Sequence, residues 1–563
     1  MTLFVAGLSI LFASLSGYAI YSYGKSITGP FIFGDELEYF LFGHDLFIGT
    51  NISRHAQYGI LYPSIEAIFF HFGDVGSVYQ WLRAFNVVIF ASSVLPVFLL
   101  ARALFALDRI MWLLLSVFAV TTSFSAYTDL IWAEPLYFML FQWLVFSLFV
   151  FYQRPQIATA CIVGSLLALL FHTKPGAGLV VDIAAIISLI TLFGAEAMRP
   201  RQRAVLAAIL AMLAVCSMLT IPWIVRNLSI GAGFIGYQSN AQSLKNLIAE
   251  MGALEVAKRT CFSAFYQLSY FFVATWGLLG ILAVTPLWRW KSLPIDVRSI
   301  AVFLAACCAG LIALMSLGSN ADAGGQEYWM PFGRYLSVTC PTIVILAMYL
   351  LRSIPNVERR EKRYLIAVTA ILAIITACAT PLLAIVPRSI VNASDLALAM
   401  AVINKGRVIW GNGYEATIFE GVAFAVLFAC FGFIGILAAK RRDVFYGFVS
   451  LVFLASLMGS LAEHRYMRVL GSSQSPTNDA IRFLREQGID FAHAVGIDRT
   501  LEESPIRFFV AFWNTSWFPL RYVPAEGLEH VHDGDLKYLI SPKVLALPVA
   551  FTAPGIYVYR LKG

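Results

Sequence analysis

The sequence predicts an α-helical membrane protein that crosses the bilayer many times and ends in a small soluble α/β domain. Of the 563 residues, 59% are hydrophobic and 13% are charged, and the mean hydropathy is +0.76. An ordinary soluble domain has roughly 25% charged residues. The apolar residues occur in runs close to the ~20 residues that a helix needs to cross the hydrocarbon layer. These features exclude a soluble globular protein, and the apolar runs are too long for the short alternating strands of a transmembrane barrel.

Thirteen apolar runs bounded by polar loops are predicted to be transmembrane helices. The first run lacks a basic leading region and a small-residue cleavage site, so we expect a retained span and not a signal peptide. An odd number of spans puts the two termini on opposite sides. The predicted spans are residues 3–22, 82–101, 110–127, 135–152, 156–171, 178–195, 204–221, 264–287, 299–317, 337–351, 364–385, 420–438 and 445–462.

Basic residues set the predicted orientation, because Lys and Arg concentrate in short cytoplasmic loops. With the N-terminus inside, the inward loops contain the basic clusters at 199–203, 359–363 and 440–442. We therefore expect a cytoplasmic N-terminus and an outward C-terminus. The segments predicted to lie outside are longer, so function is expected on the outer face. These outward segments are residues 23–81, 222–263, 318–336 and 386–419.

Two domains follow from this division, a transmembrane domain at 1–462 and an outward α/β domain at 463–563. The second has a helical pattern at 476–487, followed by the strand-like pieces FAHAVGI, LKYLI and IYVYRL. Its histidines, His464 among them, are scattered without a catalytic pattern, and acceptor docking or loop support is its expected role. Eight cysteines without CxxC spacing predict neither a disulfide framework nor a zinc site. The net charge of +7 does not imply nucleic-acid binding.

Three carboxylates, Asp35, Glu36 and Glu38, directly follow the first span in the segment GDELEYF. On a helix, the apolar side chains of this segment share one face and the acids at 35 and 38 point elsewhere. A carboxylate in such a place can be a general base, a metal ligand or a cation site. The alternative is a solvated loop end with ordinary charges.

A second pair of acids, Asp129 and Glu134, lies in the segment TDLIWAEPLYF beside a proline at the start of a helix. Carboxylates at a helix N-terminus can be caps or dipole partners, so a cap and a site are equally open. Arg83 begins the second span, where its guanidinium must find a carboxylate, a phosphate or water.

Cations on the same face are provided by Lys174 in FHTKPGAG, Arg226 in PWIVRN and Arg334 in GRYL. Lys174 can snorkel, hold an anionic group, or pair with Asp182 in the next span. Together the acids and cations fit a cavity in which Arg or Lys holds a phosphate while a carboxylate deprotonates a nucleophile. A transporter could use the same residues.

The order of these motifs resembles the GT-C glycosyltransferases, especially the bacterial members that use polyprenyl-phosphate sugars and are related to protein mannosyltransferases and aminoarabinose transferases. The resemblance covers about residues 1–462. The motifs that carry it are GDELEY, QYGILYP, WLRAFNVVIFASSVLPVFLLAR, AEPLYF, HTKP, PWIVRN and GRYL. It implies a GT-C-like fold of about 13 spans with an outward α/β domain.

The resemblance also implies an activity, the transfer of a hexosyl or pentosyl group from a polyprenyl-phosphate donor to a hydroxyl on a lipid, glycan or protein acceptor. Asp35 would be the general base, supported by Glu36, and Glu134 stands at the second acidic loop position. The cations at 174, 226 and 334 would hold the donor phosphate, with the residues at 83 and 129 in supporting roles. Glu38 is a third carboxylate that leaves the identity of the base open.

A single displacement would invert the anomeric carbon. No cofactor is expected and no metal is expected to be essential, because fixed cations neutralise the phosphate leaving group, although the clustered acids could bind a divalent ion. A bacterial inner membrane with the C-terminal domain in the periplasm is the expected location. The alternatives are a lipid-linked glycan ligase and a flippase or transporter, but the halves of the chain show none of the internal repeats typical of transporters.

Overall fold

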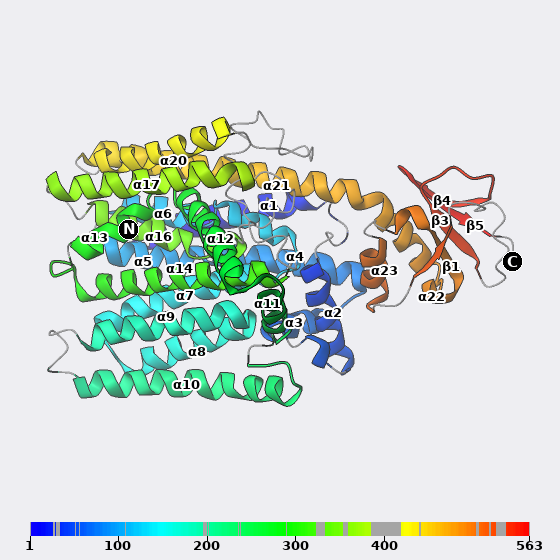
Figure 1. Cartoon of the computed structure of the whole chain (residues 1–563), viewed down its shortest axis with the longest axis horizontal. Helices are drawn as coiled ribbons and strands as arrows, with labels where there is room; N and C mark the ends of the chain where they lie inside the picture. The colour runs from blue at the N-terminus through cyan, green and yellow to red at the C-terminus, as the bar shows by residue number, and fades with distance from the viewer. Residues whose placement is uncertain are drawn as a thin grey trace.

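The protein is elongated, with a bundle of long helices at one end and a small sheet at the other (Figure 1). The structure is a computed structural model. It describes residues 2–25, 27, 29, 34–50, 52–55, 57–106, 108–194, 200, 202–234, 236, 238–288, 290–322, 333–352, 359–383, 418–438, 441–502, 506–516, 520–524 and 536–561.

Along the chain, the helices of the bundle come first and the helices and strands of the sheet region come last. The elements are α1 (Thr2–Gly24), α2 (Gly34–Ile48), η1 (Ser53–His55), α3 (Leu61–Phe69), α4 (Val75–Ser92), α5 (Val94–Phe105), α6 (Arg109–Ala119), η2 (Ser123–Asp129), α7 (Glu134–Gln153), α8 (Ile157–Thr173), α9 (Pro175–Phe193), α10 (Gln202–Ser229), α11 (Gln238–Met251), α12 (Ala253–Ala274), α13 (Leu279–Trp288), α14 (Ile295–Asp322), α15 (Gly333–Leu336), α16 (Cys340–Arg352), α17 (Arg359–Leu383), α20 (Ile418–Ala438), α21 (Arg442–Glu486), α22 (Phe491–Ala494), β1 (Val495–Asp498), η5 (Arg499–Leu501), α23 (Ile506–Asn514), β2 (Arg521–Val523), β3 (Tyr538–Ser541), β4 (Val549–Ala553) and β5 (Ile556–Arg560).

Seven helical segments among the described residues are long and apolar enough to cross a membrane, so the chain is a multi-pass α-helical membrane protein. Several shorter apolar helices accompany them. Each of the thirteen predicted spans overlaps at least one helix, while the number that cross stays a prediction. The seven segments are Thr2–Gly24, Val75–Phe105, Glu134–Gln153, Pro175–Phe193, Gln202–Ser229, Ile295–Gly318 and Arg442–Arg465.

Helices at the edge of the bundle keep apolar side chains exposed. α10 lies at one edge in Figure 1, and its Leu210 and Met218 are 56% and 77% exposed. A helix that is apolar on its outer side has no stable place in water, whereas lipid can cover that surface. The surface of α10 therefore fits the predicted membrane environment.

The segments that carry the candidate residues meet at the end of the bundle that faces the sheet. α2 and α3 lie between the bundle and the sheet in Figure 1. The segment after η2, the α8–α9 turn and α15 lie at this same end, because side-chain contacts join them to α2 and to the start of α7.

The C-terminal region contains a five-stranded sheet with the order β2-β1-β3-β5-β4. β1 pairs in parallel with β2 and β3, whereas β5 pairs in antiparallel fashion with β3 and β4. The predicted strand-like pieces correspond to β1, β3 and β5, but the first four residues of FAHAVGI form α22. The predicted fold class, a helical membrane protein with a small α/β region, is confirmed.

Helix α21 is one continuous helix of 45 residues that runs from the bundle to the sheet (Figure 1). The predicted domain boundary after residue 462 falls inside this helix, and the division at 462 stays a prediction. The two chain ends lie at opposite ends of the long axis. Because α21 connects the two parts without a loop, the C-terminal region is joined to the bundle by helix and not by a flexible linker.

Some predictions concern residues outside the described part of the chain. The outward segment 386–419 lies wholly outside it, and the segment 318–336 and the basic cluster at 199–203 lie partly outside it.

The predicted sidedness can be tested with reporter fusions in a bacterial host. Fusion of alkaline phosphatase after residue 563 is expected to give an active phosphatase, because that enzyme needs the oxidising periplasm. Fusion after Arg352, at the end of α16, is expected to give an inactive phosphatase, because the following loop is predicted to be cytoplasmic. The reverse pattern would overturn the predicted orientation.

Candidate functional site

Helix α2 presents Asp35 at its first turn. The apolar side chains of this helix are buried, with Leu37, Phe40 and Leu41 at most 1% exposed, as the spacing predicts. The side chain of Asp35 keeps 37% exposure. A carboxylate in the first turn also interacts favourably with the positive end of the helix dipole. The helix is therefore anchored by its apolar face and leaves Asp35 accessible, as it does Glu38, whose side chain is 29% exposed.

Both oxygens of Asp35 are held by partners from distant segments. Arg334 Nη2 of α15 lies 2.7 Å from Asp35 Oδ2, and the Tyr58 hydroxyl donates to Asp35 Oδ1 at 3.0 Å. Burial acts to raise the pKa of Asp35, but the charges of Arg334 and Lys174 and the two hydrogen bonds outweigh it, so the pKa lies below the usual range. Asp35 is ionised at neutral pH.

Glu134 connects the two cations of this region. Lys174 Nζ donates to Glu134 Oε1 at 2.5 Å, and Arg334 Nε lies 3.8 Å from the same oxygen. Lys174 lies in the turn between α8 and α9, and Glu134 begins α7. The structure therefore brings Asp35, Glu134, Lys174 and Arg334 together, and we call these four residues the charged site.

Aromatic rings cover the cations of the charged site. Lys174 Nζ lies 4.2 Å from the ring centre of Tyr335, and the Arg334 guanidinium lies 4.7 Å from that of Trp132. Such cation–π contacts become stronger where water is excluded. The rings leave the carboxylates and cations in a partly dry environment, where charge interactions exceed those in water.

Gly59 lets the segment between η1 and α3 approach the α8–α9 turn. A Cβ atom at this glycine would lie 2.1 Å from the carbonyl oxygen of His172. The neighbouring residue is Tyr58, which binds Asp35, and His172 is two residues before Lys174. The close backbone approach thus fixes the distance between the segments that provide the tyrosine and the lysine.

Glu36 and Glu38 point away from the charged site. Glu36 is fully buried, and its Oε1 accepts from the Tyr79 hydroxyl at 3.1 Å and from the Ile131 amide at 2.9 Å. Glu38 Oε2 lies 3.3 Å from His55 Nδ1, while His55 Nε2 lies 2.8 Å from an oxygen of Asp45. Of the three acids of the first loop, the structure brings Asp35 into the charged site.

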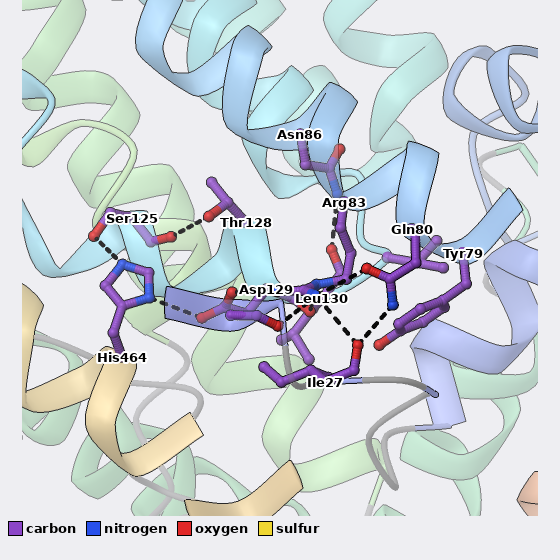
Figure 2. A network of polar contacts seen from close by, with 12 residues as sticks. Ile27, Tyr79, Gln80, Arg83, Asn86, Ser125, Thr128, Asp129, Leu130 and His464 are labelled. Atoms are coloured by element: carbon purple, nitrogen blue, oxygen red, sulfur yellow. Dashed lines mark hydrogen bonds and ion pairs between the residues drawn. The ribbon is translucent and has the colours of Figure 1, made fainter. Parts of the chain in front are cut away.

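Arg83 and Asp129 form a separate, buried network with His464 (Figure 2). Arg83 Nη2 lies 2.8 Å from Asp129 Oδ1, and His464 Nδ1 lies 2.8 Å from Asp129 Oδ2. His464 Nε2 is 3.0 Å from Ser125 Oγ. These side chains are at most 4% exposed. The serine, histidine and aspartate have the connectivity of a catalytic triad, but their burial and the second partner of Asp129 indicate a structural network.

The remaining donors of Arg83 bind backbone carbonyls at and just after the end of α1 and at the end of η2. Its Nη1 donates to the carbonyls of Gly24 at 2.7 Å and Ile27 at 3.3 Å, and its Nε donates to that of Asp129 at 3.2 Å. A Cβ atom at Gly24 would lie 2.1 Å from Arg83 Nη2. Of the three partners that the sequence left open for Arg83, a carboxylate, a phosphate or water, the structure shows a carboxylate. A side chain larger than glycine at position 24 would collide with the guanidinium.

Arg226 lies apart from the charged site. Its Nη2 donates to the Ile52 carbonyl at 2.8 Å, and its guanidinium stacks over Trp223 at 4.3 Å. None of its recorded contacts within the described segments reaches Asp35, Glu134, Lys174 or Arg334. The phosphate-binding role predicted for Arg226 stays a prediction without support from these contacts.

Three residues of this region were not predicted as site residues. Tyr58 binds the candidate base, Trp132 stacks on Arg334, and His464 pairs with an acid 335 residues earlier in the chain. Tyr58 lies in the motif QYGILYP and Trp132 in TDLIWAEPLYF, so their positions in these motifs could have marked them as site residues. His464 had no local signal, because its partner is distant in sequence. The alternative pairing of Lys174 with Asp182 is replaced by the pairing with Glu134.

Metal-ligating side chains do not gather in the described part of the chain. Within those residues, no group of three or more His, Cys, Asp and Glu is arranged to hold a metal ion.

Comparisons with known proteins find similarity at the level of solved structures. No protein family and no curated protein matches the sequence. The structure is similar to ArnT from Cupriavidus metallidurans bound to undecaprenyl phosphate, with 13% identity, 98% of each chain covered and a TM-score of 0.47. It is also similar to the apo oligosaccharyltransferase of Archaeoglobus fulgidus, with 13% identity, 96% of this chain and 69% of that chain covered, and a TM-score of 0.47. Because the identities and TM-scores are this low, the chemistry of the site is argued from its own geometry alone.

The network of Figure 2 predicts a large loss of stability when one partner of the ion pair is removed. Asp129→Asn is expected to lower the free energy of unfolding by about 3–5 kcal/mol, because Arg83 is left buried without its carboxylate. Thermal unfolding of the purified protein in detergent measures this loss. Glu486→Gln, whose side chain is 67% exposed, is the control and is expected to change little. Equal stability of the two variants would contradict the assignment.

Proposed function

We propose that this protein transfers a sugar from a polyprenyl-phosphate-linked donor to an acceptor hydroxyl on the extracytoplasmic face of the membrane. The observation that carries the proposal is the charged site, in which a partly exposed carboxylate lies between a guanidinium and a tyrosine, with an ammonium group close by. These groups match the two needs of the reaction, a base for the hydroxyl and cations for a phosphate leaving group. The order of the sequence motifs adds the lipid-linked donor.

The two cations are suited to a phosphate because each is already placed opposite an anion. Arg334 and Lys174 now hold the carboxylates of Asp35 and Glu134. A donor phosphate offers Arg334 a stronger, bidentate partner than one carboxylate oxygen. When Arg334 turns to the phosphate, Asp35 loses its nearest positive charge, so its pKa rises and its Oδ2 is free to accept a proton. Donor binding would thus prepare the base.

The reaction then needs one displacement. Asp35 takes the proton of the acceptor hydroxyl, the hydroxyl oxygen forms a bond to the anomeric carbon, and the bond from that carbon to the phosphate oxygen breaks. The polyprenyl phosphate leaves with both electrons of that bond and is stabilised by Arg334 and Lys174. One displacement inverts the anomeric configuration.

Asp35 is the base favoured by exposure and contacts. Glu36 is fully buried, and Glu38, whose side chain is 29% exposed, pairs with His55 and not with the cations of the charged site. Asp35 keeps 37% of its side chain exposed and can meet a hydroxyl from outside. Tyr58 stays bonded to Oδ1 and orients the carboxylate while Oδ2 reacts.

The proposal also includes the setting of the reaction. The charged site lies at the end of the bundle next to the C-terminal region, and the basic loops predict that this end is extracytoplasmic. We place the reaction at a bacterial inner membrane. The transferred group is a hexosyl or pentosyl group, and the acceptor is a lipid, a glycan or a protein. The fixed cations neutralise the leaving group, so no metal is assigned a step.

Replacement of the base tests the activity directly. Asp35→Asn is expected to slow transfer by about 10²–10⁴-fold, because the amide keeps the shape but cannot accept the proton. The measurement combines transfer from labelled polyprenyl-phosphate sugars by purified protein with mass spectrometry of envelope glycans from cells. Glu502→Gln is the matched control on the exposed surface.

Two results would contradict this proposal in different ways. Full activity of Asp35→Asn would show that Asp35 is not the base, while the proposed transferase activity would stand. If the wild-type protein shows no transfer and the glycans of cells with and without it are identical, the transferase proposal is wrong and a carrier function takes its place.

The ion pair with Arg334 predicts a shift in pH dependence. Asp35 must be ionised to act, and in the free enzyme, whose groups kcat/KM reports, Arg334 holds the pKa of this carboxyl low. The value of kcat/KM is therefore expected to persist until the pH falls through that low pKa. Arg334→Gln removes the cation and raises this pKa, so the acid limb of the profile of kcat/KM against pH is expected to move to higher pH. Arg482→Gln, at a partly exposed arginine of α21 that pairs with Asp479, is expected to leave the limb unchanged. An unmoved limb in Arg334→Gln would contradict the role of the pair.

A further inference from the structure

Helix α23 of the C-terminal region reaches back to the bundle and packs against α2 and α4. Figure 1 shows α23 beside α2, on the side facing the sheet. Phe512 of α23 is fully buried, with its ring centre 4.6 Å from that of Phe40 and 5.5 Å from that of Tyr79. A side chain of the C-terminal region therefore forms part of the support of the helix that bears Asp35.

The position of Phe512 is fixed by α21. The adjacent Trp513 donates its Nε1–H to Asn478 Oδ1 at 2.9 Å, and Arg485 Nε donates to the carbonyl of Trp513 at 3.2 Å. Asn478 and Arg485 belong to the long helix that begins in the bundle. Phe512 is thus attached to a rigid element and not to a free surface.

Two contacts lead from Phe512 to Asp35. The first is the contact of Phe512 with Phe40, which lies five residues after Asp35 on the same helix. The second passes through Tyr79, whose hydroxyl donates to Glu36 Oε1 at 3.1 Å, and Glu36 is the neighbour of Asp35. In a helix with 3.6 residues per turn, a small rotation moves a first-turn side chain by ångströms. Phe40 fixes the middle of α2 and Glu36 fixes its start, so the ring of Phe512 constrains the rotation that aims Asp35 at Arg334.

We propose that Phe512 is a positioning residue for glycosyl transfer, which holds α2 in the rotation that places the Asp35 carboxylate against Arg334 and the incoming hydroxyl. This inference rests on the proposed function. It gives the C-terminal region a part in the reaction that differs from binding the acceptor.

Phe512→Ala is expected to lower kcat by about 10–100-fold, because a displacement of about 1 Å costs up to ~10²-fold. The KM for the donor is expected to stay near its wild-type value, since Arg334 and Lys174, the proposed phosphate ligands, are not on α2. The acid limb of the profile of kcat/KM against pH, which reports the free enzyme, is expected to move to higher pH as Asp35 loosens from Arg334. Phe512→Leu retains most of the apolar volume and is expected to recover most of kcat.

Phe551→Ala is the matched control for damage to the C-terminal region. Phe551 of β4 stacks on Phe483 of α21 with ring centres 5.0 Å apart. Phe551→Ala also removes a phenyl ring from the C-terminal region, but one that does not contact α2 in the contacts described, and it is expected to keep the wild-type pH profile. If Phe512→Ala lowers only the amount of active protein, with kcat per folded molecule and the acid limb unchanged, Phe512 is a packing residue and the inference is wrong.

Hydrogen exchange tests the inference without any activity. Amides of α2 in the purified full chain are expected to exchange at least about tenfold faster in Phe512→Ala than in the wild type or in Phe551→Ala, because the helix loses its support. Equal protection of α2 in all three proteins would overturn the inference. A wild type without transferase activity would overturn the proposed function instead, and the exchange result would still decide whether Phe512 holds α2.

Discussion

The buried ion pair of Arg83 with Asp129 is the constraint on which the arrangement of the bundle end facing the sheet depends. A guanidinium without exposure to water must have its donors satisfied, since an unpaired buried charge is very costly. Arg83 meets this need with one carboxylate and with backbone carbonyls at the end of α1, and His464 of α21 binds the other carboxylate oxygen. One network therefore ties α1, α4, η2 and the last long helix together.

This network also determines where the charged site forms. η2 ends at Asp129, and the next residues bind neighbouring segments, with Asn86 donating to the Leu130 carbonyl and the Ile131 amide donating to Glu36. Glu134 follows directly at the start of α7. With η2 fixed by the ion pair, both α2 and the first turn of α7 are placed, and the acids they carry face the cations of α15 and the α8–α9 turn.

The charged site contains two carboxylates and two cations that pair with one another. A ligand that takes one of these partners leaves the opposite charge available to react. A phosphate would take the cations and release a carboxylate, which links binding of the donor to the activation of the base in the proposed reaction. Helix α2 has the most demanding position, because its acid must remain accessible while its other faces are fixed by Tyr79, Ile131 and Phe512.

The sequence by itself determined the helical membrane fold, the strands β1, β3 and β5, the apolar face of α2 and the candidate acids and cations, because these follow from composition and from short periodic patterns. The tertiary structure alone decided the partners. It paired Lys174 with Glu134 and not with Asp182, turned Glu38 to His55, placed Arg226 elsewhere, and joined Asp129 to His464. The physical reason is that a local pattern fixes the direction of a side chain on its own helix, whereas the charge that it meets belongs to another segment whose position depends on the packing of the whole chain.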